Sequence, residues 1–141
     1  MSNSITWVTP KRPRGVNSHR GQFYVSIGWS KSKNVKNHQI TIYVFEDAMR
    51  DFRWVVGDKL EIGFDDSFIY MRRSNDGPYR LTSATGQKVD EVIGKPTRAR
   101  VAFTKPQDFP FEQIQRTHLA KNDVSFDCDG IVSFIYPKGA N

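Results

Sequence analysis

Residues 57–71 read Gly-Asp-Lys-Leu-Glu-Ile-Gly-Phe-Asp-Asp-Ser-Phe-Ile-Tyr-Met, and this stretch sets the expected fold of the whole chain. Leu60, Ile62 and Phe64 alternate with polar residues or glycine, which is the period-two pattern of a β-strand with one apolar face. The Asp-Asp-Ser that follows is typical of a turn, and residues 68–71 then return as a partner strand. The stretch therefore predicts a β-hairpin.

The residues before this hairpin predict two further strands and a short helix. Aromatic and β-branched side chains dominate residues 23–29 and 40–45, as in strands. Glu46 and Asp47 then begin a helix, because acidic side chains favour the positive end of the helix dipole. Apolar residues follow at helical spacing and predict a side that faces the core, at Ala48, Met49 and Phe52.

The second half of the chain echoes the first. Residues 98–103 predict a strand, residues 111–119 a helical stretch, and residues 123–136 a hairpin around an Asp-Gly turn. The tetrapeptide Ser-Phe-Ile-Tyr occurs at 67–70 and again at 133–136, in the return strand of each predicted hairpin. An internal duplication and a chance match both explain this repeat.

These patterns predict a mainly β protein with one or two short helices. Its 141 residues fit one compact domain, or two small halves around one core. The expected organisation is a basic flexible arm at 1–21, a β-rich half at 22–83, a linker at 84–96 and a second, diverged β-rich half at 97–141. If the halves are copies, we expect them to share their core as an internally duplicated pseudo-dimer.

The net charge of +6 is concentrated near the N-terminus. Residues 1–40 contain no acid, and their basic residues are Lys11, Arg12, Arg14, Arg20, Lys31, Lys33 and Lys36. Segregated positive charge of this kind is the usual footprint of a protein that binds a polyanion such as nucleic acid. A solvated leader that aids solubility is the alternative interpretation.

Residues 42–74 resemble the AbrB-like, swapped-hairpin DNA-binding module of bacterial transition-state regulators and antitoxins. The resemblance rests on a strand, a short helix, a Gly-Asp turn and a charged-tipped hairpin in the family's order: Ile42-Tyr-Val44, residues 46–52, residues 56–62 and residues 64–73. The family usually has proline after the strand, where this chain has Phe45, and a Gly-Arg pair before it, where His38 and Gln39 stand.

The resemblance implies a swapped-hairpin barrel that binds double-stranded DNA, either as a homodimer or as a single-chain pseudo-dimer. It also implies a transcriptional regulator of a bacterium or a bacteriophage. A second, shorter stretch, Thr9-Pro-Lys-Arg-Pro-Arg-Gly15, resembles the opening of an AT-hook, whose arginines enter the narrow minor groove of A·T tracts. A generic basic arm is the alternative, since Val16-Asn17 follow where the hook continues with Arg-Pro.

The DNA-contacting residues are expected in the arm, in the loop after the first strand and at the start of the second half. They are Lys11, Arg12, Arg14, Arg20, Lys31, Lys33, Lys36, His38, Arg98 and Arg100. Contacts to phosphates supply affinity and register, and nothing in the sequence identifies residues that read base edges.

No arrangement of residues in the sequence predicts catalysis. His19, His38 and His118 lack the His-x-x-x-His spacing of zinc enzymes, and there is no glycine-rich phosphate loop. Cys128 falls at an inward-facing strand position, which favours a small buried residue over a nucleophile. We therefore expect a protein that is not an enzyme and that uses neither cofactor nor metal.

The sequence also lacks membrane and export signals. No apolar stretch approaches the ~20 residues that span a bilayer. The N-terminal residues lack the apolar run of a signal peptide. We therefore expect a cytoplasmic protein of a bacterium or of a phage-infected host cell.

Two other functions fit the same sequence. One is a protein-interaction module, such as a phage-encoded inhibitor of a host protein, which would use the acidic middle third as its working surface. The other is a single-stranded nucleic-acid binder that combines basic loops with exposed aromatic side chains, for which Trp29 is the best stacking candidate.

Overall fold

The computed structural model describes residues 23–30, 38–112 and 114–137, and these residues form two five-stranded antiparallel sheets. Sheet A consists, in spatial order, of β6 (Thr82–Ser83), β7 (Ala99–Thr104), β2 (Gln39–Val44), β1 (Val25–Ser30) and β8 (Thr117–Leu119). Sheet B consists of β5 (Tyr79–Arg80), β3 (Lys59–Phe64), β4 (Phe68–Arg73), β10 (Ile131–Ile135) and β9 (Val124–Phe126). The predicted mainly β architecture is confirmed.

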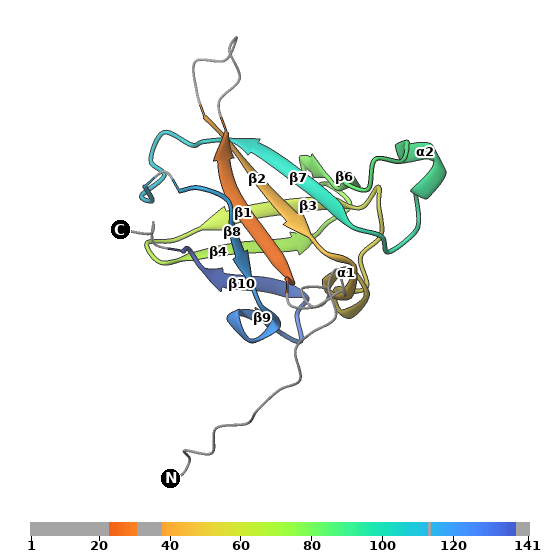
Figure 1. Cartoon of the computed structure of the whole chain (residues 1–141). Helices are drawn as coiled ribbons and strands as arrows, with labels where there is room; N and C mark the ends of the chain where they lie inside the picture. Colours follow the sequence, from red (N-terminus) through yellow and green to blue (C-terminus); the bar gives the residue numbers. More distant parts are fainter. Residues whose placement is uncertain (1–22, 31–37, 113, 138–141) are drawn as a thin grey trace, which may run out of the picture.

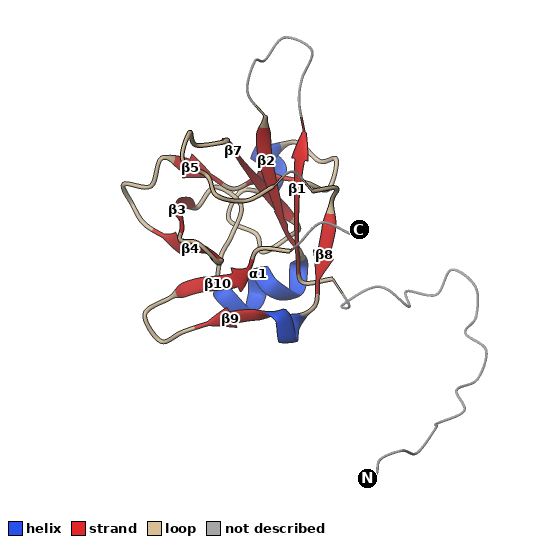
Figure 2. Cartoon of the chain, turned by 90° about the vertical axis from the view of Figure 1, so that its left-hand side faces the viewer, coloured by secondary structure: helices blue, strands red, loops and turns tan. Residues whose placement is uncertain are grey.

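Short helical segments connect some of these strands: α1 (Glu46–Phe52), α2 (Val89–Val92) and the 3₁₀ helix η1 (Lys121–Asp123). The strands of sheet A cross in front of those of sheet B in Figure 1, and α1 lies next to β9 and β10 in Figure 2. Helix α1 begins at the predicted acidic pair and buries the predicted face of Ala48, Met49 and Phe52. Among the described residues, no helix is long and apolar enough to cross a membrane.

One hydrophobic core lies between the two sheets and is extended by α1. Alternation within the strands builds it: Ile40, Ile42 and Val44 of β2 are fully buried, while the residues between them face outward. In the hairpin of β3 and β4, Leu60 is fully buried. Ile62 and Phe64, on the same predicted face, are only partly buried at the margin of the core.

The two halves of the chain are arranged in a related way. Each half contributes one central strand to sheet A, β2 or β7, and these two strands pair antiparallel. Each half also contributes one hairpin to sheet B, β3–β4 or β9–β10, and the hairpins join through the antiparallel pair β4–β10. Both halves therefore contribute to the same core, while the duplication itself stays a prediction.

The repeated tetrapeptide does not mark equivalent positions in the two hairpins. Ile69 of the first copy is fully buried, whereas Ile135 of the second copy faces outward and is 61% exposed. Phe134 is buried in turn, whereas Phe68 lies on the outer side of sheet B. The two copies are out of phase by one residue, and a one-residue shift turns every side chain to the opposite face.

Two expectations about the second half are wrong. The predicted helical stretch at 111–119 instead ends in strand β8, which pairs with the edge of β1. Cys128 is exposed in the β9–β10 turn, because the Asp127 carboxylate accepts hydrogen bonds from the backbone N–H groups of Asp129 and Ile131 and so fixes that turn. Between the halves, the residues of the predicted linker, 84–96, include α2, which buries Val92 in the core.

Candidate nucleic-acid interface

The outer face of sheet A, which faces the viewer in Figure 1, carries one row of side chains across all five strands. The row is fixed by strand register, which pairs Thr82 with Arg100, Arg100 with Tyr43, Tyr43 with Ser26 and Ser26 with His118. Ser26 in the middle is fully buried, so the accessible part of the row consists of Thr82, the Arg100 cation, the Tyr43 ring and the His118 imidazole. No acidic residue belongs to it.

Three arginines gather at this end of the sheet. Arg98, Arg100 and Arg116 line an open groove of about 400 Å³ together with Tyr43 and with the turn that follows β6. The end of β6 contributes Ser83 to the lining, and the turn contributes Ala84, Gly86 and Gln87. Arg98 and Arg100 reach the groove from one side because residues two apart on a strand share a face.

Arg98 is held in place by the turn. Its Nε and Nη2 atoms donate hydrogen bonds to the carbonyl oxygen of Ala84, at 2.9 and 2.5 Å. Its guanidinium carbon also lies 5.9 Å from the centroid of the Phe45 ring. These contacts orient the guanidinium without neutralising its charge.

Arg116 reaches the groove from the segment before β8. Its guanidinium carbon lies 4.1 Å from the centroid of the Tyr43 ring, within the range of a cation–π contact. Gly28 of β1 makes this position accessible, because a Cβ atom there would come within 2.9 Å of the Cα of Arg116. The glycine therefore lets the chain cross β1 closely enough for Arg116 to cover Tyr43.

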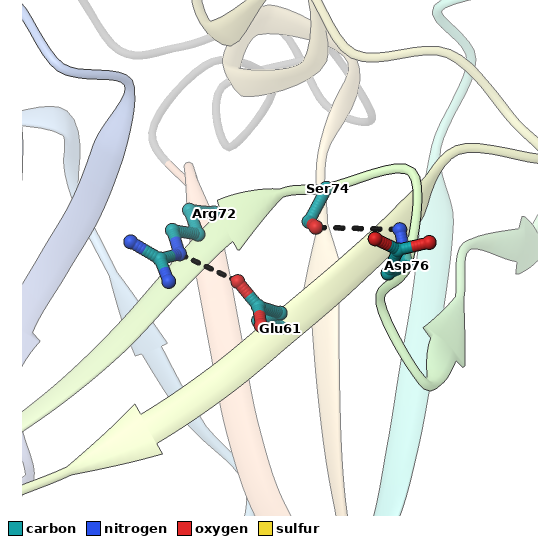
Figure 3. A network of polar contacts seen from close by, with 4 residues as sticks. All are labelled: Glu61, Arg72, Ser74 and Asp76. Atoms are coloured by element: carbon teal, nitrogen blue, oxygen red, sulfur yellow. Dashed lines mark hydrogen bonds and ion pairs between the residues drawn. The ribbon is translucent and has the colours of Figure 1, made fainter.

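None of these three arginines forms an ion pair with a carboxylate in the described part of the chain. The ion pairs that occur there join Arg50 to Glu46, Arg72 to Glu61, Arg73 to Asp58 and Lys121 to Asp51. Figure 3 shows the contrast on sheet B, where Arg72 of β4 donates to Glu61 of β3 at 2.6 Å, next to the turn in which the Asp76 N–H donates to Ser74. The arginines of the groove thus present uncompensated positive charge, although acids outnumber bases among the described residues.

His118 lies at the far end of the row, on β8. Its imidazole stacks on the ring of Phe23, with centroids 3.9 Å apart and planes 16° apart. Burial, and secondarily the positive charge of Arg116, lower the pKa of His118 below its ordinary value of 6.5. The imidazole is therefore neutral near pH 7, and an anion bound beside it would favour protonation.

A second polar cluster ties α1 to the connection before β9. The Tyr24 hydroxyl donates to Asp51 at 2.5 Å, and Lys121 pairs with the same carboxylate at 3.3 Å. Burial, followed by the hydrogen bond to Asp51, raises the pKa of Tyr24, while that hydrogen bond lowers the pKa of Asp51. The hydroxyl, the carboxylate and the ammonium group are hydrogen-bonded or ion-paired with one another. We therefore assign this cluster a role in stabilising the fold.

The structure separates the predicted contact residues into three sets. Arg98 and Arg100 come together in the groove. His38 lies just before β2, at the opposite end of the β2–β7 pair, with its ring 5.3 Å from that of Trp29. The remaining predicted residues lie outside the described part of the chain: Lys11, Arg12, Arg14, Arg20, Lys31, Lys33 and Lys36.

Tyr43 and Arg116 belong to the groove but were not among the predicted residues. The sequence around each residue gave no reason to choose it: Tyr43 belongs to an apolar strand, and Arg116 belongs to a stretch expected to be helical. The alternation of Arg116 and His118 with Thr117 and Leu119 is the period-two signal that could have placed them on one face of a strand.

Comparisons with known protein families, with characterised proteins and with solved structures found no match to this chain. The resemblance to the AbrB-like module therefore stays a prediction. Among the described residues, no group of three or more histidines, cysteines or acids is placed to hold a metal ion.

Proposed function

We propose that this chain is a DNA-binding protein whose folded domain contacts DNA through the outer face of sheet A. The observation that carries the proposal is the convergence of Arg98, Arg100 and Arg116 on one groove, where no carboxylate of the described residues pairs with them. Like charges repel one another, so gathering three of them opposes folding unless an anion compensates. A guanidinium group binds phosphate well, because its fixed N–H donors match two phosphate oxygens in bidentate geometry.

The side chains along the outer face of sheet A support the same function. A sheet face with a cation–aromatic row offers phosphate contacts from its arginines and a stacking surface beside them. The basic residues of 1–40 add positive charge from the same chain and would extend the contact along the DNA backbone. The AbrB-like resemblance of residues 42–74 adds a role in transcriptional regulation, in a bacterium or a bacteriophage, to this proposal.

The test compares two triple variants in a duplex-binding assay. Arg98→Gln, Arg100→Gln and Arg116→Gln together remove the charge of the groove. Arg50→Gln, Arg72→Gln and Arg80→Gln remove the same charge from α1 and sheet B and serve as the matched control. Fluorescence anisotropy with a labelled 20-base-pair duplex should show an affinity at least about tenfold weaker for the groove variant than for the control.

The outcomes separate the rival functions. Equal weakening by both triple variants would show a general charge effect and would contradict the proposed surface. Preferential binding of single-stranded DNA, lost in the groove variant, would move the assignment to the single-strand binder. Absence of binding to either form at low salt would favour the protein-interaction module.

A further inference from the structure

The groove holds more positive charge than a single backbone phosphate requires. A phosphodiester in a nucleic-acid strand carries one negative charge, whereas a terminal phosphomonoester carries about −1.5 to −2 near pH 7. Three guanidinium groups face one groove here, and its lining contains no acid. We propose that this groove binds a phosphomonoester, the terminal phosphate of a nucleic-acid strand. This inference rests on the proposed function, because it assigns a ligand to the same surface.

The arginines are positioned to surround such a group from two sides. Arg98 and Arg100 come from the β7 side, where Arg98 is fixed by its two hydrogen bonds to Ala84 and retains its Nη1 donors. Arg116 comes from the β8 side and is fixed by its contact with Tyr43. Arginines that are already oriented lose less conformational freedom on binding, so a charged oxygen gains more from each hydrogen bond.

Apart from the arginines and Tyr43, the lining of the groove consists of small and polar residues. Ser83, Ala84 and Gly86 leave room for close approach, and Gly86 adopts a φ of +86° that other residues rarely take. A Cβ atom added at Gly86 would meet no other atom, so the space in front of the turn is open. The groove volume of about 400 Å³ falls in the range of sites that hold a molecule of nucleotide size.

The experiment uses the full chain and internally labelled oligonucleotides that differ only at their ends. Duplexes with a 5′-phosphate, with a 3′-phosphate and with hydroxyl ends are compared by fluorescence anisotropy at about 150 mM salt. We expect one phosphorylated end to bind about tenfold tighter than the hydroxyl end. The double variant Arg100→Gln/Arg116→Gln should lose this preference, and the matched double variant Arg72→Gln/Arg80→Gln should keep it.

Competition identifies the source of the phosphate. Adenosine monophosphate is a phosphomonoester without a strand, and inorganic phosphate is a dianion of similar charge. Both are added as competitors against the phosphorylated duplex. Competition at high micromolar or millimolar concentration, with the end preference intact, supports a strand-end site. Equal affinity for all duplexes, with binding still dependent on the groove arginines, overturns the inference and leaves the proposed function standing. Binding of adenosine monophosphate without any binding of DNA supports the monoester site and overturns the proposed function instead.

Discussion

The guanidinium carbon of Arg116 lies 4.1 Å above the ring of Tyr43, so a cation that precedes β8 covers an aromatic side chain of β2. The two residues are 73 positions apart in the chain. Only β1 separates β2 from β8 in the sheet, so Arg116 can reach Tyr43 across that one strand. The contact fixes one of the three groove arginines and gives the face a stacked, positively charged surface.

Replacing Tyr43 tests this contact. Tyr43→Phe keeps the ring and should bind duplex like the unaltered protein. Tyr43→Leu removes the ring face, frees Arg116 and should weaken binding about two- to fivefold, since exposed cation–π contacts contribute about 0.5–1 kcal/mol. Isothermal titration calorimetry measures both affinities. A Leu variant that binds as tightly as the Phe variant would show that the ring does not position Arg116.

The basic N-terminal segment has its own prediction. Lys11→Ala, Arg12→Ala and Arg14→Ala together should reduce the slope of log affinity against log salt by roughly 2–3, because each phosphate contact contributes about −0.9. The melting temperature should not change, since the flexible arm that the sequence predicts for residues 1–21 would contribute little packing. Duplex binding at four salt concentrations gives the slope. An unchanged slope would remove these three residues from the DNA contact.

Leu60 anchors the hairpin that defines the fold. Its side chain is fully buried between the sheets, so Leu60→Ala should lower the free energy of unfolding by about 2–5 kcal/mol. The neighbouring Ile62 is only partly buried, and Ile62→Ala should cost less than the leucine change. Urea denaturation compares the two. A larger loss at Ile62 than at Leu60 would mean that the register of β3 is different.

The sequence predicted this part of the fold because its signals are local. The period of two in residues 59–71 and the acidic start of α1 are read within a few residues, and both elements occur where expected. The alternation in residues 116–119 is too short to identify strand β8 by itself, because three residues form a strand only where the edge of β1 offers them hydrogen bonds. Arg116 could not be assigned to the site without that non-local pairing.

The same limit applies to the candidate site. Arg98 and Arg100 were predicted from charge and strand pattern, and both line the groove. His38 was predicted from its neighbours in sequence. It precedes β2, whereas Arg98 and Arg100 lie at the other end of the β2–β7 pair, so His38 is not part of the groove. Charge patterns in a sequence therefore indicate that a surface is basic, whereas the pairing of strands decides which charges meet.

The hydrogen bond between Tyr24 and Asp51 predicts a dependence of stability on pH. The pKa of Asp51 is lowered from 3.8 in the folded protein, so its contribution to stability is present above that value and is lost as the pH falls through the folded pKa. Tyr24→Phe should therefore reduce the free energy of unfolding by about 0.5–1.5 kcal/mol near pH 7. The difference should shrink at pH 2.5. A constant difference across this range would show that the hydroxyl stabilises the fold without Asp51.

The most direct test of the proposed DNA surface is a nuclear magnetic resonance titration of the isotope-labelled full chain with a short duplex. We expect the side-chain Nε–H signals of Arg98, Arg100 and Arg116 to shift together with backbone signals of β7, β2 and β8. The Nε–H signal of Arg72 on sheet B should stay in place. Shifts confined to sheet B, with the groove arginines unaffected, would contradict the proposed interface.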